Sequence, residues 1–274
     1  MSTPTAARRA SDRGYALALA AAAVLSLTGI LVRHLGTTHG LPPLELTFWR
    51  SALVVLTLAP WLAARHPGRL RLGRHALGPV LGLGASLAAM NVLWTCSVAR
   101  VGAALGTVLI YTSGAFTALL GALLLGERLG LAMAVAVAAC LGGTVLVAGL
   151  PGGGQDAGAV LAADPAGVTL GVLSGLAYAV YGLAGRAAAR RGVDAFTGVL
   201  YAFALGGALT GVLLALLGAL EPGSVALLRL GADAAGWADL LLLAAGPTVI
   251  GFGLYGRSLT LLPASVANLV LTLE

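Results

Sequence analysis

The sequence predicts an all-α polytopic membrane protein composed of two inverted five-helix repeats. Three observations predict this class: a series of long apolar stretches, an alternation of arginine-rich and arginine-poor gaps, and an internal similarity between the two halves. Of the 274 residues, 59% are hydrophobic and only 9% are charged. A soluble chain of this length needs a larger polar share to cover its exterior, whereas lipid accepts an apolar outer surface.

Eight apolar stretches are long enough to cross a bilayer, because a hydrocarbon core of roughly 30 Å needs about 20 apolar residues. They are residues 15–32, 45–64, 76–98, 103–125, 129–150, 167–184, 195–220 and 237–256. A ninth stretch begins near Ala264 and stops at Glu274, the last residue. We therefore expect about nine spans of a ten-helix fold, with the last span incomplete.

Glycine spacing predicts close contact between these helices. The chain has 40 glycines, and small residues four positions apart let membrane helices approach closely. Such spacings occur at Gly78/Gly82, Gly102/Gly106, Gly167/Gly171/Gly175 and Gly207/Gly211. They predict a tightly packed helical bundle.

Arginine placement predicts the orientation in the membrane. All 16 basic residues are arginines. With a cytoplasmic N-terminus, most lie at inner ends of spans, and only Arg33, Arg100 and Arg229 lie at outer ends. Because such a bias is typical of cytoplasmic loops, we expect an integral protein of the cytoplasmic (plasma) membrane with its N-terminus inside. The basic residues then set topology, so we expect no nucleic-acid partner.

Neither the cysteines nor the histidines form a recognisable ligand set along the chain. Cys96 and Cys140 lie inside apolar stretches, without a Cys or His at ligand spacing. The four histidines fall in gaps between the stretches and match no catalytic or zinc-binding motif: His34, His39, His66 and His75. We therefore expect no metal, no cofactor and no catalytic residues.

A glycine-rich segment divides the chain. Residues 151–166 predict a linker between a first five-helix repeat, residues 1–150, and a second repeat, residues 167–274. The two parts share short patterns at matching positions. Thr28-Gly29 with Arg33 matches Tyr181-Gly182 with Arg186, and the region from Trp94 matches the region from Tyr255.

The number of spans in each repeat fixes their relative orientation. Because five is odd, two similar five-span halves enter the membrane from opposite sides and are inverted repeats. Many transporters have this organisation, with the binding site between the repeats. The same alignment places Glu274 opposite Ser113, so the second repeat is truncated within its fourth helix.

Several short runs resemble the EamA-like family of the drug/metabolite transporter superfamily. They are Phe48-Trp49-Arg50, Asn91-Val-Leu-Trp94 through Val101-Gly-Ala, Gly126-Glu127-Arg128-Leu129, and Ala177-Tyr178-Ala-Val-Tyr181 followed by Arg186. The resemblance covers nearly the whole chain from about Tyr15. It implies a ten-helix fold and the export of amino acids, related metabolites or drugs. The sequence departs from the family pattern at Gly114, where proline is common, and in lacking the tenth helix.

Arg50 is the charged residue expected within a span. It lies roughly 8 Å inside the outer end of the 45–64 stretch, at 1.5 Å per residue. Intramembrane charges usually face a cavity or a partner, so its guanidinium is a candidate to bind a substrate carboxylate through two hydrogen bonds. Alternatively, Arg50 anchors its helix at the outer headgroups or pairs with Glu45.

Glu274 is the candidate proton-coupling residue. It is the carboxylate expected nearest the middle of the membrane, and intramembrane acids are typical of proton relays. A structural pair with Arg50 is the alternative. Protons are therefore the candidate coupling ion.

Polar and aromatic residues recur at helical spacing within the spans. We expect the substrate pathway to be formed by Thr28, Arg50, Asn91, Trp94, Thr107, Tyr111, Ser174, Tyr178, Tyr181, Tyr255, Asn268 and Thr272. Such groups suit a wet cavity that accepts a small amphipathic solute. The alternative is ordinary hydrogen bonding between helices, with Trp and Tyr at the membrane interface. Their recurrence in both halves favours the pathway.

Together these observations predict a secondary transporter, an exporter of small metabolites or drugs that works by alternating access. Its expected partners are a small-molecule substrate and the lipid bilayer. A membrane channel or a structural membrane subunit is the alternative. An intramembrane enzyme is a weaker one, because the chain lacks the catalytic clusters that such enzymes need.

Overall fold

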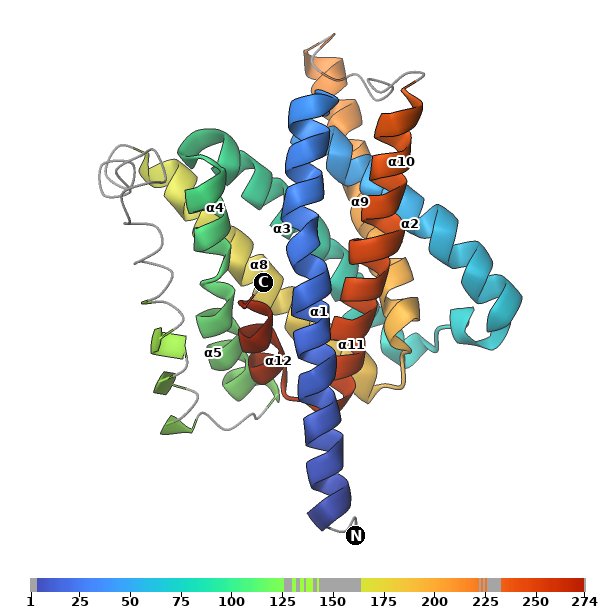
Figure 1. The fold of residues 1–274 in the computed structure, drawn as a ribbon, viewed down its shortest axis with the longest axis vertical. Coiled ribbons are helices and arrows are strands. Elements are labelled where there is room, and N and C mark those ends of the chain that lie inside the picture. The colour runs from blue at the N-terminus through green and yellow to red at the C-terminus, as the bar shows by residue number, and fades with distance from the viewer. Residues whose placement is uncertain are drawn as a thin grey trace.

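The protein is a bundle of long helices, seen in a computed structural model (Figure 1). The structure describes residues 4–125, 164–221 and 233–273, with isolated positions between 130 and 142 and at 223 and 225. Within the described residues, every element is helical. Seven segments are long and apolar enough to cross a membrane, which confirms the all-helical membrane class. The predicted stretch 129–150 lies largely outside the described residues.

Residues 126–163, between the first two described ranges, are called the gap. Four predicted spans precede it, with two short helical turns between the second and the third. Their elements are α1 (Pro4–Thr38), α2 (Pro43–Arg65), η1 (Pro67–Leu70), η2 (Arg74–Ala76), α3 (Leu77–Val101) and the pair α4 (Ala103–Ile110) and α5 (Ser113–Leu125). After the gap follow α8 (Pro165–Arg190), α9 (Ala195–Leu220), the continuous run α10 (Ala234–Leu243), η3 (Ala244–Gly251) and α11 (Phe252–Leu261), and finally α12 (Ala264–Leu271). Helix α8 begins two residues before the predicted second repeat.

An aspartate begins each of the three long helical runs after the gap. Asp164 accepts from the amide of Gly167 at 2.8 Å, and Asp194 accepts from the amide of Phe196 at 3.1 Å. Asp233 accepts from the amides of Ala235 and Gly236, both at 3.1 Å. Each carboxylate satisfies amides that lack a partner in the first turn and complements the positive end of the helix.

The predicted 103–125 span is interrupted in its middle. Helix α4 ends at Ile110 and α5 begins at Ser113, with a turn at Tyr111 and Thr112. The Thr112 hydroxyl donates to the Leu109 carbonyl at 2.7 Å, and the Thr112 amide donates to the same oxygen at 3.2 Å. Side-chain and tight-turn bonds of this kind satisfy backbone groups where a membrane helix is broken. This break was not predicted from the sequence.

The span that contains α10 and α11 is widened in its middle by the π-helical segment η3. Pro247 lies inside η3 and interrupts the hydrogen-bond ladder, because proline lacks an amide hydrogen. The Thr248 hydroxyl donates to the Leu243 carbonyl at 2.8 Å and so uses an oxygen of the preceding turn. π-Helical turns often occur at functional sites. Phe252, the residue directly after η3, lines the cavity described below.

Several helix pairs join the parts of the chain on either side of the gap, and two of them are antiparallel pairs that correspond to each other in the two predicted repeats. Helix α3 packs along α8, so that Gly82 approaches Ala184 while Val101 approaches Gly167. Helix α1 packs along α11 and the following turn, so that Gly14 approaches Leu262. Farther along α1, Leu25 approaches Gly251.

The glycine series in α8 makes the close contacts that its spacing predicts. A Cβ atom at Gly167 would lie 2.6 Å from the Val101 side chain, and one at Gly171 would lie 2.6 Å from the Leu109 side chain. At Gly175 a Cβ atom would lie 3.0 Å from the Ile110 carbonyl oxygen. These glycines therefore let α8 touch α3, α4 and the turn before α5.

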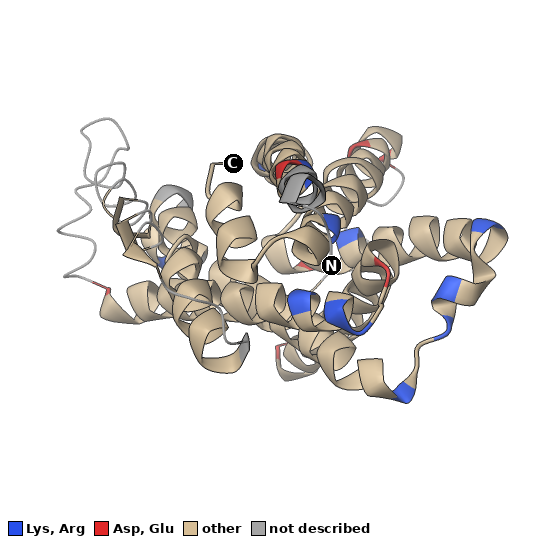
Figure 2. Ribbon diagram, turned by 90° about the horizontal axis from the view of Figure 1, so that it is seen from below, with Lys and Arg blue, Asp and Glu red and all other residues tan. Residues whose placement is uncertain are grey.

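Most described arginines gather at the end of the bundle from which α1 starts (Figure 2). There, Arg69 pairs with Asp194 at 3.3 Å, and the Tyr201 hydroxyl donates to the Leu70 carbonyl at 2.8 Å. At the same end the Arg257 guanidinium lies 5.0 Å from the ring centre of Phe196. These contacts fasten the α2–α3 connection and α11 to the start of α9.

Arg100 and Asp164 form an ion pair at the opposite end. The Nε atom of Arg100 lies 3.0 Å from Asp164 Oδ2, and its Nη2 atom lies 3.1 Å from Oδ1. The Gly167 amide, together with Arg100, holds the pKa of the Asp164 carboxyl below its usual range. The pair therefore fixes the end of α3 to the start of α8.

We expect this contact to make stability depend on pH in the acidic range. Since the pKa of Asp164 is lower in the folded state, its stabilisation is complete above the unfolded value near 3.8 and is lost as the pH falls through the folded value. Thermal unfolding in detergent should therefore show a steeper acid loss for the wild type than for Asp164→Asn, which keeps a capping oxygen but no charge. Equal slopes would contradict the assignment.

Candidate functional site

A cavity of about 330 Å³ lies in the half of the bundle where α1 ends and α2 begins. Helices α1, α2, α3, α4 and α8 line it, together with Phe252 of α11. Seven of the residues expected in a substrate pathway meet there: Thr28, Arg50, Asn91, Trp94, Thr107, Tyr111 and Tyr178. Its volume is at the lower end of the range for small-molecule sites.

Arg50 supplies the positive charge of the cavity. Only 8% of the residue is exposed, so Arg50 does not extend along the outer surface of the protein. Its Nη2 atom donates to Asn91 Oδ1 at 3.2 Å, and its guanidinium carbon lies 6.0 Å from the ring centre of Phe203. Asn91 and Phe203 therefore hold the guanidinium in place from α3 and α9.

Two polar atoms on the cavity wall are buried and lack a hydrogen-bond partner among the described residues. They are Arg50 Nε and Thr28 Oγ1. Buried polar groups are nearly always hydrogen-bonded, to protein, to water or to a ligand. The Arg50 guanidinium and the Thr28 hydroxyl therefore each keep a hydrogen-bonding capacity that the described residues do not use.

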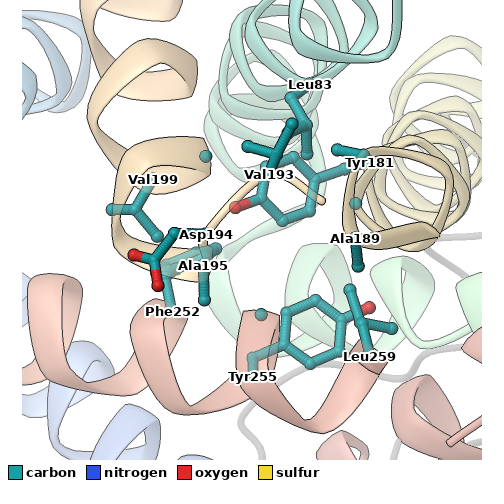
Figure 3. A pocket seen from close by; sticks show the side chains of 14 residues that line it. Leu83, Tyr181, Ala189, Val193, Asp194, Ala195, Val199, Phe252, Tyr255 and Leu259 are labelled. Carbon is teal, nitrogen blue, oxygen red and sulfur yellow. The ribbon is translucent and has the colours of Figure 1, made fainter. Parts of the chain in front are cut away.

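Aromatic side chains border the cavity on the side of α9 and α11. The ring centre of Phe252 lies 5.4 Å from the ring centre of Phe203 and 5.7 Å from that of Tyr181. Tyr181 stacks on Tyr255 at 6.4 Å. Beyond Phe252 lies a pocket of only about 30 Å³, between these tyrosines and the start of α9 (Figure 3). A space of that size holds about one water molecule.

The other residues predicted for the pathway lie outside the cavity. Tyr181 and Tyr255 belong to the neighbouring aromatic cluster. Ser174 is fully buried and donates to the Gly171 carbonyl at 2.6 Å. Asn268 is fully buried and donates to Thr117 at 2.6 Å, and Thr272 donates to the Leu269 carbonyl. Glu274 lies outside the described residues.

Several residues of the cavity wall were not predicted from the sequence. Thr47 lies one turn before Arg50 on the same face of α2, a spacing that the helical period could have indicated. Ile110 is the last residue of α4, where the run Thr112-Ser113-Gly114 was an available signal for the break. Phe252 had no sequence signal, because its position depends on the π-helical segment before it.

Comparison with known proteins identifies the family. The model of the EamA-like transporter family matches residues 12–149. The chain belongs to the EamA-like transporter family. This finding confirms the resemblance seen in the sequence.

Membership of the EamA-like family makes the chain an integral membrane protein of a transporter type. The matched region includes six of the seven predicted residues that line the cavity, all except Tyr178. The family is one of transporters and not of enzymes. Membership of this family implies a small-molecule substrate and a lipid environment.

The fold is also that of a solved structure. One crystal structure superposes with a TM-score of 0.69 at 22% sequence identity, over 97% of this chain and 84% of the other. At that identity the likeness concerns the fold alone. No curated protein matches the chain.

Proposed function

We propose that this EamA-like protein is a secondary transporter that exports small metabolites or drugs by alternating access. The observation that carries the proposal is the cavity around Arg50, to which helices from both sides of the gap contribute. Its buried guanidinium favours solutes with a carboxylate, and its Trp and Tyr side chains favour an apolar portion beside it.

The proposed mechanism requires two halves that are related by inversion. Helices α1 and α8 are the first spans of the two halves, and α3 and the run containing α11 are the third spans. Exchanging the halves therefore converts the α3–α8 pair into the α11–α1 pair. The antiparallel packing of both pairs supports the inverted relation. Residues 1–150 and 167–274 are the proposed repeats. The proposed movement is a rocking of one half against the other around the cavity.

The aromatic cluster explains why a solute would reach the cavity from only one side of the membrane at a time. Phe252, Tyr181 and Tyr255 separate the cavity from the arginine-rich end. With the N-terminus in the cytoplasm, as the arginine distribution indicates, the cavity lies in the outer half of the bundle. Protons are the proposed coupling ion, and Glu274 remains the proposed carrier.

Purified protein in liposomes tests the function. We expect flux of at least one labelled solute from a panel of amino acids and cationic drugs, with a dependence on an imposed proton gradient. Absence of flux for the whole panel would count against a transporter. Flux that is unaffected by the gradient and shows no saturation would favour the channel alternative.

Thiol labelling tests the position of the cavity. In a variant whose native cysteines are replaced by alanine, we expect Thr107→Cys to react with a membrane-impermeant maleimide added outside intact cells, because Thr107 lines the cavity. The matched variant Ser174→Cys should stay unlabelled, because Ser174 is fully buried. Labelling of Thr107→Cys only in inside-out vesicles would reverse the proposed orientation.

A further inference from the structure

Two histidines and two aspartates meet at the end of the bundle where α1 ends. His34 and Asp239 approach to 3.3 Å through Nε2 and Oδ2, and His39 Nε2 lies 3.4 Å from the same carboxylate oxygen. The ligand atoms of these three residues all lie within 4.8 Å of one another. This grouping was not predicted from the sequence, because Asp239 comes from the distant helix α10.

We propose that His34, His39 and Asp239 bind a divalent transition-metal ion of the zinc class. Two imidazoles and one carboxylate are a ligand set typical of such ions, with the fourth position left to water. In a tetrahedral site with bonds of about 2.0–2.1 Å, ligand atoms are about 3.3–3.4 Å apart. Two of the three separations already have that length.

The second nitrogen of each imidazole has a partner that prepares Nε2 for the metal. His39 Nδ1 lies 2.5 Å from Asp233 Oδ2, and His34 Nδ1 lies 3.2 Å from the Thr38 hydroxyl. Metal-binding histidines usually donate their other N–H to a carboxylate or another oxygen, which fixes the tautomer and the ring orientation. This arrangement places both Nε2 atoms toward Asp239.

The surroundings hold the ligands and leave them accessible. The His39 side chain is only 9% exposed, whereas His34 and Asp239 are 48% and 32% exposed, so an ion can enter from water. Beneath the ligands an apolar cluster joins the end of α1 to α2 and α10: Leu35, Leu41, Leu46, Leu240 and Leu243. Trp49 and Trp237 pack against this cluster with ring centres 4.9 Å apart. The ligand-bearing segments are thus already packed together before any ion binds.

Calorimetric titration of the purified full-length protein with zinc chloride tests the site. The protein is purified without a histidine tag, in detergent. We expect one ion per chain, release by a chelator, and no competition from excess magnesium chloride, since magnesium prefers oxygen ligands. An increase in the thermal unfolding temperature on zinc addition should accompany binding.

Matched variants separate the site from adventitious zinc binding. We expect His39→Gln and Asp239→Asn to weaken the affinity at least tenfold. Asp233→Asn, which keeps an oxygen to cap α10, should weaken it about 10- to 100-fold. His75→Gln removes an exposed histidine between α2 and α3 and should leave the affinity unchanged.

Size-exclusion profiles show whether each variant is folded. Should His39→Gln aggregate, His34→Gln carries the test, because its side chain is half exposed and its loss disturbs packing little. Zinc binding by folded His34→Gln and Asp239→Asn with wild-type affinity would overturn the proposal. Failure of the wild type to bind zinc at all would also overturn it, whatever the outcome of the transport assays.

Discussion

Replacing Arg50 with glutamine should reduce transport in liposomes roughly 10- to 100-fold at low substrate concentration, while leaving the protein folded. The guanidinium is the buried cationic group on the cavity wall, and its Nε atom has no partner among the described residues. Glutamine can still donate to Asn91 but cannot form a charged, two-bond contact with a carboxylate. Losing one such contact with a substrate costs about 1.5–3 kcal/mol, or roughly a 10- to 100-fold loss of affinity.

Two further variants make the Arg50 experiment specific. Arg50→Lys keeps the charge but not the planar fork, so we expect partial flux with a raised KM. Arg65→Gln removes an exposed arginine at the other end of α2 and should transport normally. Normal flux by folded Arg50→Gln would show that the residue has only a structural role, in its contact with Asn91.

Replacing Gly175 with valine should prevent the bundle from packing. A Cβ atom there would meet the Thr112 hydroxyl, and it would lie 3.0 Å from the Ile110 carbonyl oxygen and 3.1 Å from the Ser113 amide nitrogen. Backbone atoms cannot move aside as a flexible side chain can. Overpacking of this kind costs about 1–3 kcal/mol, and the γ-methyl groups of valine add to the clash. Fluorescence-detected size exclusion should show mostly aggregated protein.

Gly78→Val is the matched control for Gly175→Val. It introduces the same β-branched side chain into a membrane helix, but beyond its own turn of helix no described atom lies within 4 Å of a Cβ atom at Gly78. We therefore expect a profile like that of the wild type. A similar loss of folded protein in both variants would mean that helix propensity, not packing, decides the outcome.

The spans followed from the sequence because membrane crossing is a local property. Each span needs only enough apolar residues in one continuous run, and a window of residues reveals them. The same holds for the glycine series of α8, since residues four apart share a helix face whatever lies opposite. The interruption at Tyr111 was missed although the run Thr112-Ser113-Gly114 was an available signal, and in the structure Gly175 of α8 lies against this turn.

The candidate site was predicted only in part, for a related reason. Arg50, Asn91 and Trp94 were found because charge and helical spacing single them out within an apolar span. Ser174 and Asn268 also carry polar side chains, yet Ser174 donates to the Gly171 carbonyl of its own helix and Asn268 donates to Thr117 of α5. A helix has several faces, and its own sequence does not say which face borders the cavity.

The sequence by itself determined the membrane class, most span positions and the family resemblance, and it indicated an orientation. Each depends on residues that are close together in the chain. Only the tertiary structure decided which polar groups share the cavity and that His34 and His39 meet Asp239. These contacts join residues from different helices, and their distances depend on how the helices pack against one another. That packing is a sum of many contacts, and no single segment encodes it.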